Sequence, residues 1–153
     1  EPEGRFPDAI FTDSTQNFLT VTEGLAELRL IKVSGVERLA QSSLQDKMFR
    51  FKAVLTSSYL PEYSFEIIEF GYDVSLFPVA IELEEGIRKE LVVDELGVDN
   101  NFQDIYVVSC ETEKKFEQQL SEIFSTQRFK KTVGGLMKIA RAKKPPSLFE
   151  KND

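Results

Sequence analysis

Acidic side chains on and after an apolar stretch near the middle of the chain are the residues best suited to do chemistry. The group consists of Asp73, Glu82, Glu84 and Glu85. Glu82 and Glu84 alternate with apolar residues, so on a strand their side chains would share one face. Carboxylate oxygens are ligands that suit Mg²⁺. If a neighbouring strand brings Asp73 close, then Asp73, Glu82 and Glu84 form a candidate magnesium site.

Two interpretations of this acidic group remain open. In the first, the protein is a Mg²⁺-dependent nuclease or phosphodiesterase that uses these carboxylates. Metal-dependent nucleases of the restriction-enzyme type add a lysine two residues after the last acid, but here Leu83 and Glu84 follow Glu82. In the second, the acids belong to a solvent-facing strand that leads into the first turn of a helix, where acids suit the helix dipole. We favour the second interpretation.

Other catalytic chemistry is excluded or disfavoured by residue types that are missing. The chain has no histidine, so Ser-His-Asp and Cys-His catalysis cannot be assembled within it. One cysteine without histidine leaves too few strong ligands for zinc. That cysteine, Cys110, ends an apolar stretch and is expected to be buried and structural. Glycine-rich phosphate and dinucleotide loops are also missing, so we expect no cofactor and a protein that is not an enzyme.

A basic segment near the end of the chain is the second candidate site. Residues 127–144 contain seven basic and no acidic residues, whereas the rest has 12 basic and 26 acidic residues, a net charge of −14. On a helix, the apolar residues of this segment would lie along one side. Such a cationic amphipathic helix suits an acidic protein groove, nucleic-acid phosphates or an anionic surface, or it only covers the sheet of its own domain. The candidate partner-binding residues are Arg128, Lys130, Lys131, Lys138 and Arg141.

Two adjacent glycines interrupt this helical pattern. Gly134 and Gly135 each weaken a helix by about 1 kcal/mol relative to alanine. We interpret the pair as a place where another backbone packs closely, with a phosphate contact as the alternative.

Strands of alternating polarity must position the acidic group. We predict an antiparallel meander followed by one more strand, over residues 48–57, 63–76, 79–83 and 105–108. Within 63–76 the apolar phase shifts by one residue from Ile68 onward, which is what a β-bulge produces. We also predict a strand over 26–33, where the apolar spacing fits a helix as well.

Four helices are expected around these strands. The first two cover 36–45 and 84–96, the latter ending at Gly97. A third is capped by Ser109, and its apolar residues are Phe116, Leu120, Ile123 and Phe124. The same spacing recurs out of phase at Phe129, Val133, Leu136 and Met137, so a break near Ser125 and Thr126 must separate the third helix from a fourth.

The predicted fold is α+β, with a mostly antiparallel, bulged sheet covered on one face by helices that include the two C-terminal ones. A chain of 153 residues is long enough to bury a core without disulfides or a structural metal. We expect an irregular N-terminal arm over 1–17, a single globular domain over 18–142 and a flexible tail over 143–153.

Partner and compartment follow from charge and composition. The net charge of −7 disfavours nucleic acid as the main partner, although residues 127–144 leave that alternative open. No apolar run is long enough to span a bilayer, no secretory leader is recognisable, and one cysteine cannot form an internal disulfide, so we expect a cytoplasmic protein. The favoured function is a non-catalytic protein-interaction or regulatory domain. Its oligomeric state is not indicated by the sequence.

Overall fold

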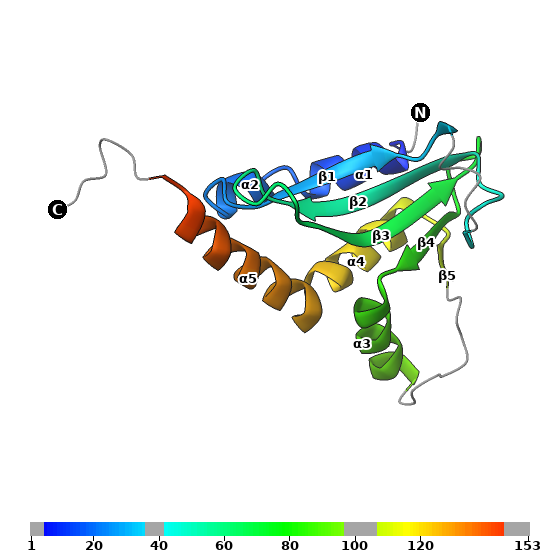
Figure 1. Ribbon diagram of the computed structural model, residues 1–153. Coiled ribbons are helices and arrows are strands. Elements are labelled where there is room, and N and C mark those ends of the chain that lie inside the picture. The colour runs from blue at the N-terminus through cyan, green and yellow to red at the C-terminus, as the bar shows by residue number, and fades with distance from the viewer. Residues whose placement is uncertain (1–4, 36–41, 97–106, 146–153) are drawn as a thin grey trace.

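A five-stranded antiparallel sheet, with strands in chain order, forms the centre of the protein (Figure 1). The computed structural model describes residues 5–35, 42–96 and 107–145. The strands are β1 (Glu27–Lys32), β2 (Phe49–Thr56), β3 (Ser64–Tyr72), β4 (Val79–Leu83) and β5 (Val107–Cys110). The helices are α1 (Pro7–Ser14), α2 (Phe18–Val21), α3 (Glu85–Leu96), α4 (Glu113–Phe124) and α5 (Gln127–Lys143). The predicted α+β class and antiparallel meander are confirmed, and so is the strand predicted over 26–33.

The predicted β-bulge lies in β3. Ala53 of β2 pairs with Ile68 and Val54 pairs with Glu66, so Ile67 is an extra residue without a partner on β2. Both Ile67 and Ile68 are buried, because the bulge lets two consecutive apolar side chains leave solvent. The phase shift in the sequence therefore has the predicted cause.

One face of the sheet carries an aromatic core beneath α1 and α4. Phe70 of β3 stacks on Phe51 of β2 with ring centroids 5.6 Å apart. The same ring meets Phe11 of α1 at 6.0 Å and Phe116 of α4 at 5.4 Å. Aromatic pairs at these separations stabilise a preferred ring arrangement, in addition to the apolar area that they bury. Helices from both ends of the chain thus cover the same face of the sheet (Figure 1).

The opposite face of the sheet is polar, and the connection between β1 and β2 crosses part of it. Ser43 donates a hydrogen bond of 2.6 Å to Glu82 of β4, and Leu44 is buried. Further along, a Cβ atom on Gly71 of β3 would lie 2.9 Å from Cβ of Lys47. The segment 42–48 is therefore packed directly against the strands, and Gly71 leaves the room that it needs.

The two C-terminal helices are separated where the sequence predicts a break. α4 ends at Phe124, and α5 begins at Gln127. The side chain of Thr126 accepts a hydrogen bond of 3.2 Å from the backbone N–H of Phe129, which is the expected helix cap. The change of direction lets Phe116, Leu120 and Ile123 of α4 and Phe129 of α5 all be buried, although the two stripes are out of phase.

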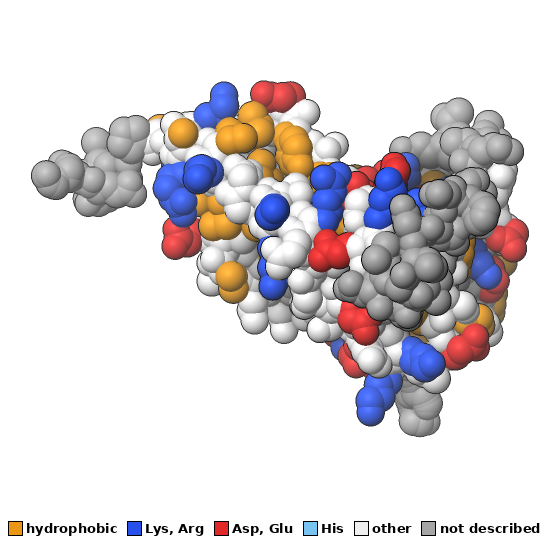
Figure 2. Space-filling model, turned by 90° about the horizontal axis from the view of Figure 1, so that it is seen from below, with side chains coloured by type: hydrophobic (Ala, Val, Ile, Leu, Met, Phe, Trp, Pro, Cys, Tyr) orange, Lys and Arg blue, Asp and Glu red, His pale blue; other side chains and the backbone are white. Residues whose placement is uncertain are grey.

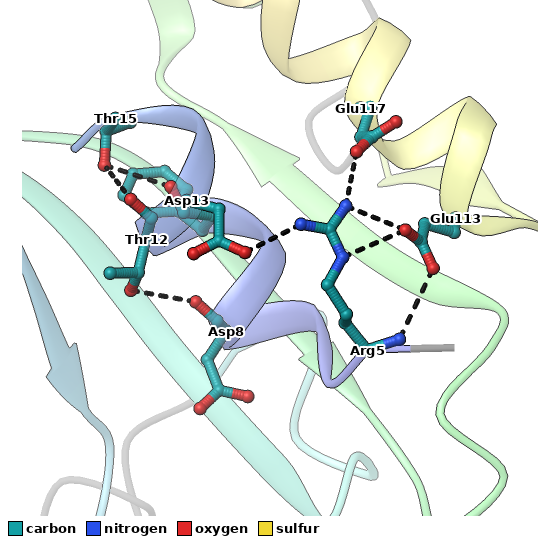
Figure 3. A network of polar contacts seen from close by, with 8 residues as sticks. Arg5, Asp8, Thr12, Asp13, Thr15, Glu113 and Glu117 are labelled. Atoms are coloured by element: carbon teal, nitrogen blue, oxygen red, sulfur yellow. Dashed lines mark hydrogen bonds and ion pairs between the residues drawn. The ribbon is translucent and has the colours of Figure 1, made fainter. Parts of the chain in front are cut away.

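Within the irregular arm expected over 1–17, residues Pro7–Ser14 instead form the helix α1, while residues 1–4 lie outside the described structure. Pro7 occupies the first position of α1, where its missing N–H and fixed φ favour a helix start. Arg5 then ties α1 to α4 (Figure 3): its guanidinium lies 2.7 Å from Asp13 of α1, 2.7 Å from Glu113 and 2.5 Å from Glu117 of α4. The interpretation of Pro7 as a sign of irregular structure is therefore wrong, and Pro2 lies outside the described residues.

Other expectations about the ends of elements need correction. β5 continues to Cys110, so Ser109 lies within the strand and Thr112 caps α4 instead, accepting a hydrogen bond of 3.1 Å from the N–H of Lys115. Residues 42–45 form a turn rather than the end of a helix, while 36–41 lie outside the described residues. β3 ends at Tyr72, before the predicted limit of 76. The predicted cap Gly97, residues 105–106 of the predicted strand and residues 146–153 of the predicted tail also lie outside the described part.

Candidate functional site

A cavity of about 510 Å³ opens between β3, β4 and the start of α3. Its charged lining residues are Glu66, Glu69, Glu82, Glu84, Glu85 and Arg88, and Ile67, Ile68 and Leu83 also line it. Two of the three residues of the predicted magnesium site, Glu82 and Glu84, therefore do line one cavity. The sequence did not indicate that Glu66 and Glu69 join them, because cross-strand neighbours depend on the register of β3 and β4.

Every acidic side chain of this cavity already has a donor within the protein. The closest contacts are Lys52 to Glu66 at 3.7 Å, Arg50 to Glu69 at 2.7 Å, Ser43 to Glu82 at 2.6 Å, Lys89 to Glu85 at 3.3 Å and Arg128 to Glu84 at 2.6 Å. These donors neutralise most of the negative charge that a cation would require. The arrangement is that of a structural charge network.

The third residue of the predicted magnesium site lies elsewhere. Asp73 accepts a hydrogen bond of 2.9 Å from the backbone N–H of Met48, and its carboxylate lies 3.8 Å from Nζ of Lys47. Within the described residues, no group of three or more Asp, Glu or Cys side chains is arranged to hold a metal ion. The candidate set Asp73, Glu82 and Glu84 is therefore not assembled, because Asp73 holds the β1–β2 connection against the end of β3.

The acidity of two cavity carboxyls is shifted in opposite directions. Burial raises the pKa of Glu66, and this effect together with the charges of Glu69 and Glu82 outweighs the lowering by Lys52. Burial would also raise the pKa of Glu84, but hydrogen bonds from Arg128 and from the backbone of Ile87 and Gly86 outweigh it, so this pKa lies below its usual value. Glu84 is thus held as a charged group by its protein partners.

The five basic residues predicted to bind a partner fall into two groups. Arg128 and Arg141 make internal ion pairs, with Glu84 at 2.6 Å and with Glu23 at 3.3 Å. Arg128 also lies over the ring of Phe65, 5.1 Å from its centroid. The remaining three, Lys130, Lys131 and Lys138, are exposed and make no ion pair with any described residue.

The three lysines lie away from the buried side of α5. Phe129, Leu136 and Ala140 of α5 are buried. Lys131 and Lys138 are seven residues apart, so they lie on the same side of the helix about 10 Å apart along its axis. In Figure 2, which shows the molecule from below, basic side chains are spread along the left part of the surface, where α5 lies. We call Lys130, Lys131 and Lys138 the α5 lysine face.

The glycine pair of α5 does not pack against another part of the described chain. A Cβ atom on Gly134 or Gly135 would meet nothing within 4 Å, and both residues are exposed. The expectation of close backbone packing at this pair is therefore wrong within the described structure. The pair instead leaves bare backbone between Lys131 and Lys138.

Cys110 is buried, as expected for a structural cysteine. Its side chain is 2% exposed at the end of β5, and burial raises the pKa of the thiol to about 11. A thiol with this acidity is protonated at neutral pH and is a poor nucleophile.

The comparisons with known proteins add no functional information. No protein-family model, no curated protein and no solved structure matches the chain. Among the described helices, none has the length and apolar character that crossing a membrane requires.

Proposed function

We propose that this protein is a non-catalytic interaction domain that binds an acidic partner protein through the α5 lysine face. The observation that carries the proposal is the contrast within one helix: Arg128 and Arg141 pair with acids of the same chain, whereas Lys130, Lys131 and Lys138 have no ion-pair partner among the described residues. Their positive charges point to solvent in a chain whose net charge is −7. They are thus available to an acidic surface.

Electrostatics supports a protein over nucleic acid as the partner. The chain outside residues 127–144 has a net charge of −14, which repels a long polyanion wherever it extends beyond α5. An acidic groove or helix of a protein needs only local complementarity with the α5 lysine face. Phe129 and Leu136 of α5 belong to the core and Ile139 is 47% exposed, so an anionic membrane would find only a small apolar anchor on this helix.

The absence of a complete catalytic set within the described residues also supports a binding role. The cavity carboxylates are paired with donors, and the thiol of Cys110 is buried and protonated. Rim charges of the kind found on α5 mainly set the association rate and its salt dependence. We therefore expect binding to weaken as salt concentration rises.

The test is affinity capture from a cell lysate with a charge-reversal variant. The variant K130E/K131E/K138E removes the α5 lysine face, and K32E/K114E/K115E makes the same charge change at three other exposed lysines. Half of each sample is treated with nuclease. We expect a protein that the wild type and the control retain, that the α5 variant loses, and that survives nuclease. Capture that nuclease abolishes would show that the partner of the α5 lysine face is nucleic acid. Equal capture by both variants would refute the role of α5.

A further inference from the structure

Glu90 of α3 caps the N-terminus of α5 from another helix. Its carboxylate accepts hydrogen bonds from the backbone N–H of Gln127 at 2.7 Å and of Arg128 at 3.1 Å. The first N–H groups of a helix have no partner inside the helix and form its positive end. α5 has no acidic residue in its own first turn. Glu90 supplies the negative charge that α5 lacks.

Glu84, directly before α3, makes the second contact with the same end of α5. Its carboxylate lies 2.6 Å from Nη2 and 3.2 Å from Nε of Arg128, and it also accepts a hydrogen bond of 2.9 Å from the N–H of Ile87. A Cβ atom on Gly86 would lie 2.6 Å from Nε of Arg128, so glycine leaves room for this contact. We call the contacts of Glu84 and Glu90 with residues 127 and 128 the α3–α5 clasp.

Beyond the clasp, α5 is attached mainly by apolar contacts along one side. Only Phe129, Leu136 and Ala140 of its 17 residues are buried. The ion pair between Arg141 and Glu23 near the other end joins two side chains that are 57% and 72% exposed, so it adds little. The exposed pair Gly134 and Gly135 further weakens the helix itself. The polar attachment of α5 is therefore concentrated at its first turn.

We propose that the α3–α5 clasp is a lock on α5: when its contacts are lost, α5 leaves the body of the domain as a unit and uncovers its apolar side. The inference does not depend on the proposed function, because it concerns the isolated domain. The α5 that is released would be a cationic helix with an uncovered apolar stripe, whereas the locked α5 keeps Phe129, Leu136 and Ala140 buried.

Acidification is the chemical signal that fits this lock. Glu84 faces Arg128 on α5 and lies near Tyr63, which directly precedes β3. It shares the cavity with Glu85 and Arg88 of α3 and with Glu66, Glu69 and Glu82. Glu90 faces the N–H groups of residues 127 and 128. Because its partners lower the pKa of Glu84, its contact is fully present above the usual glutamate range and is lost as pH falls through the lowered value.

Hydrogen exchange of the isolated domain at pH 7 tests the lock. In the variant E84Q/E90Q, we expect the amides of α5 to lose protection by about tenfold or more, because hydrogen bonds to charged groups are the stronger ones. The amides of β2 and β3 should keep their protection. The control E111Q/E122Q neutralises two exposed acids that lie outside the clasp and should behave like the wild type.

Three outcomes overturn the proposal. Unchanged protection of α5 in E84Q/E90Q would show that the apolar contacts alone hold the helix. An equal loss of protection in α5 and in the strands would show that the clasp stabilises the whole domain and does not lock one helix. The single variant E90Q, which leaves the ion pair of Glu84 and Arg128 in place, should show a smaller loss confined to α5, and protection identical to that of the wild type would likewise contradict the lock.

Discussion

Nε of Arg50 on β2 lies 2.7 Å from Oε2 of Glu69 on β3, and both side chains are almost fully buried. The two residues occupy the polar face of the sheet, beneath the connection from β1. Nη1 of Arg50 is buried and has no hydrogen-bond partner in the described structure. Arg50 and Glu69 therefore form a buried ion pair in which one nitrogen of Arg50 has no acceptor among the described residues. Removing one partner of such a pair usually costs much stability, whereas replacing both partners with apolar residues often leaves stability unchanged.

We predict strong coupling between these two residues. Glu69→Leu alone leaves a buried unpaired guanidinium and should lower the free energy of unfolding by about 3–5 kcal/mol. Arg50→Met combined with Glu69→Leu should be less destabilising than either single change. Urea unfolding of the four proteins gives the coupling energy. The neighbouring pair of Lys52 and Glu66 is the control: K52M/E66L should change stability by less than about 1 kcal/mol, because this pair is partly exposed.

Gly71 should not tolerate a side chain. A Cβ atom at this position would lie 2.9 Å from Cβ of Lys47 and 3.2 Å from the backbone oxygen of Phe49. Gly71→Ala should therefore destabilise the protein by about 1–3 kcal/mol, as overpacking does in a close-packed interior. Thermal unfolding measures the effect. A stability equal to that of the wild type would mean that the segment 42–48 moves aside without cost.

Alanine in place of the α5 glycines should have the opposite effect. Gly134→Ala and Gly135→Ala place a methyl group in open space on a helix, so each should stabilise the protein by about 0.5–1 kcal/mol. Chemical unfolding at neutral pH checks this. The double variant G134A/G135A can also be used in the capture experiment. If it captures less of the same partner protein although α5 is more stable, the partner must contact the backbone at Gly134 and Gly135 closely.

Cys110 should react slowly in the folded protein. Because burial raises its pKa to about 11, its thiolate fraction at pH 8 is on the order of 100-fold below that of an unfolded cysteine, whose pKa is about 8.5. A thiol reagent should modify the native protein at least that much more slowly than the urea-unfolded protein. Fast labelling of the native protein at pH 8 would contradict the burial of Cys110.

The same thiol should make stability depend on pH in the alkaline range. Its contribution to the free energy of unfolding is complete below about pH 8.5 and is lost as pH rises toward 11, since the unfolded state loses its proton first. Cys110→Ala should remove that part of the pH dependence, which urea unfolding at pH 8 to 11 would measure.

Local pattern was sufficient to predict much of the sheet and both C-terminal helices. The one-residue phase shift at Ile68 predicted the bulge, since side chains alternate strictly along a strand. The out-of-phase stripes that end at Phe124 and restart at Phe129 predicted the break that Thr126 caps. Local pattern failed at α1, where Pro7 starts a helix, and at Ser109, which continues β5. At both places a short-range signal has two meanings, and long-range packing selects one.

The candidate site was predicted only in part, because charges depend on partners that are far apart in sequence. The sequence by itself determined which residue types are present: no histidine, one cysteine, many acids and a C-terminal segment with seven basic residues. It also determined the periodicities that make strands and helices. Only the tertiary structure decided that Arg128 and Arg141 are paired, while Lys130, Lys131 and Lys138 have no ion-pair partner in the described part of the chain. It also decided that Asp73 lies apart from Glu82 and Glu84, and that Glu90 caps α5. The physical reason is that periodicity reflects only a few neighbouring residues. Ion pairs and helix caps contributed by another helix form between elements whose relative placement is set by the shared core.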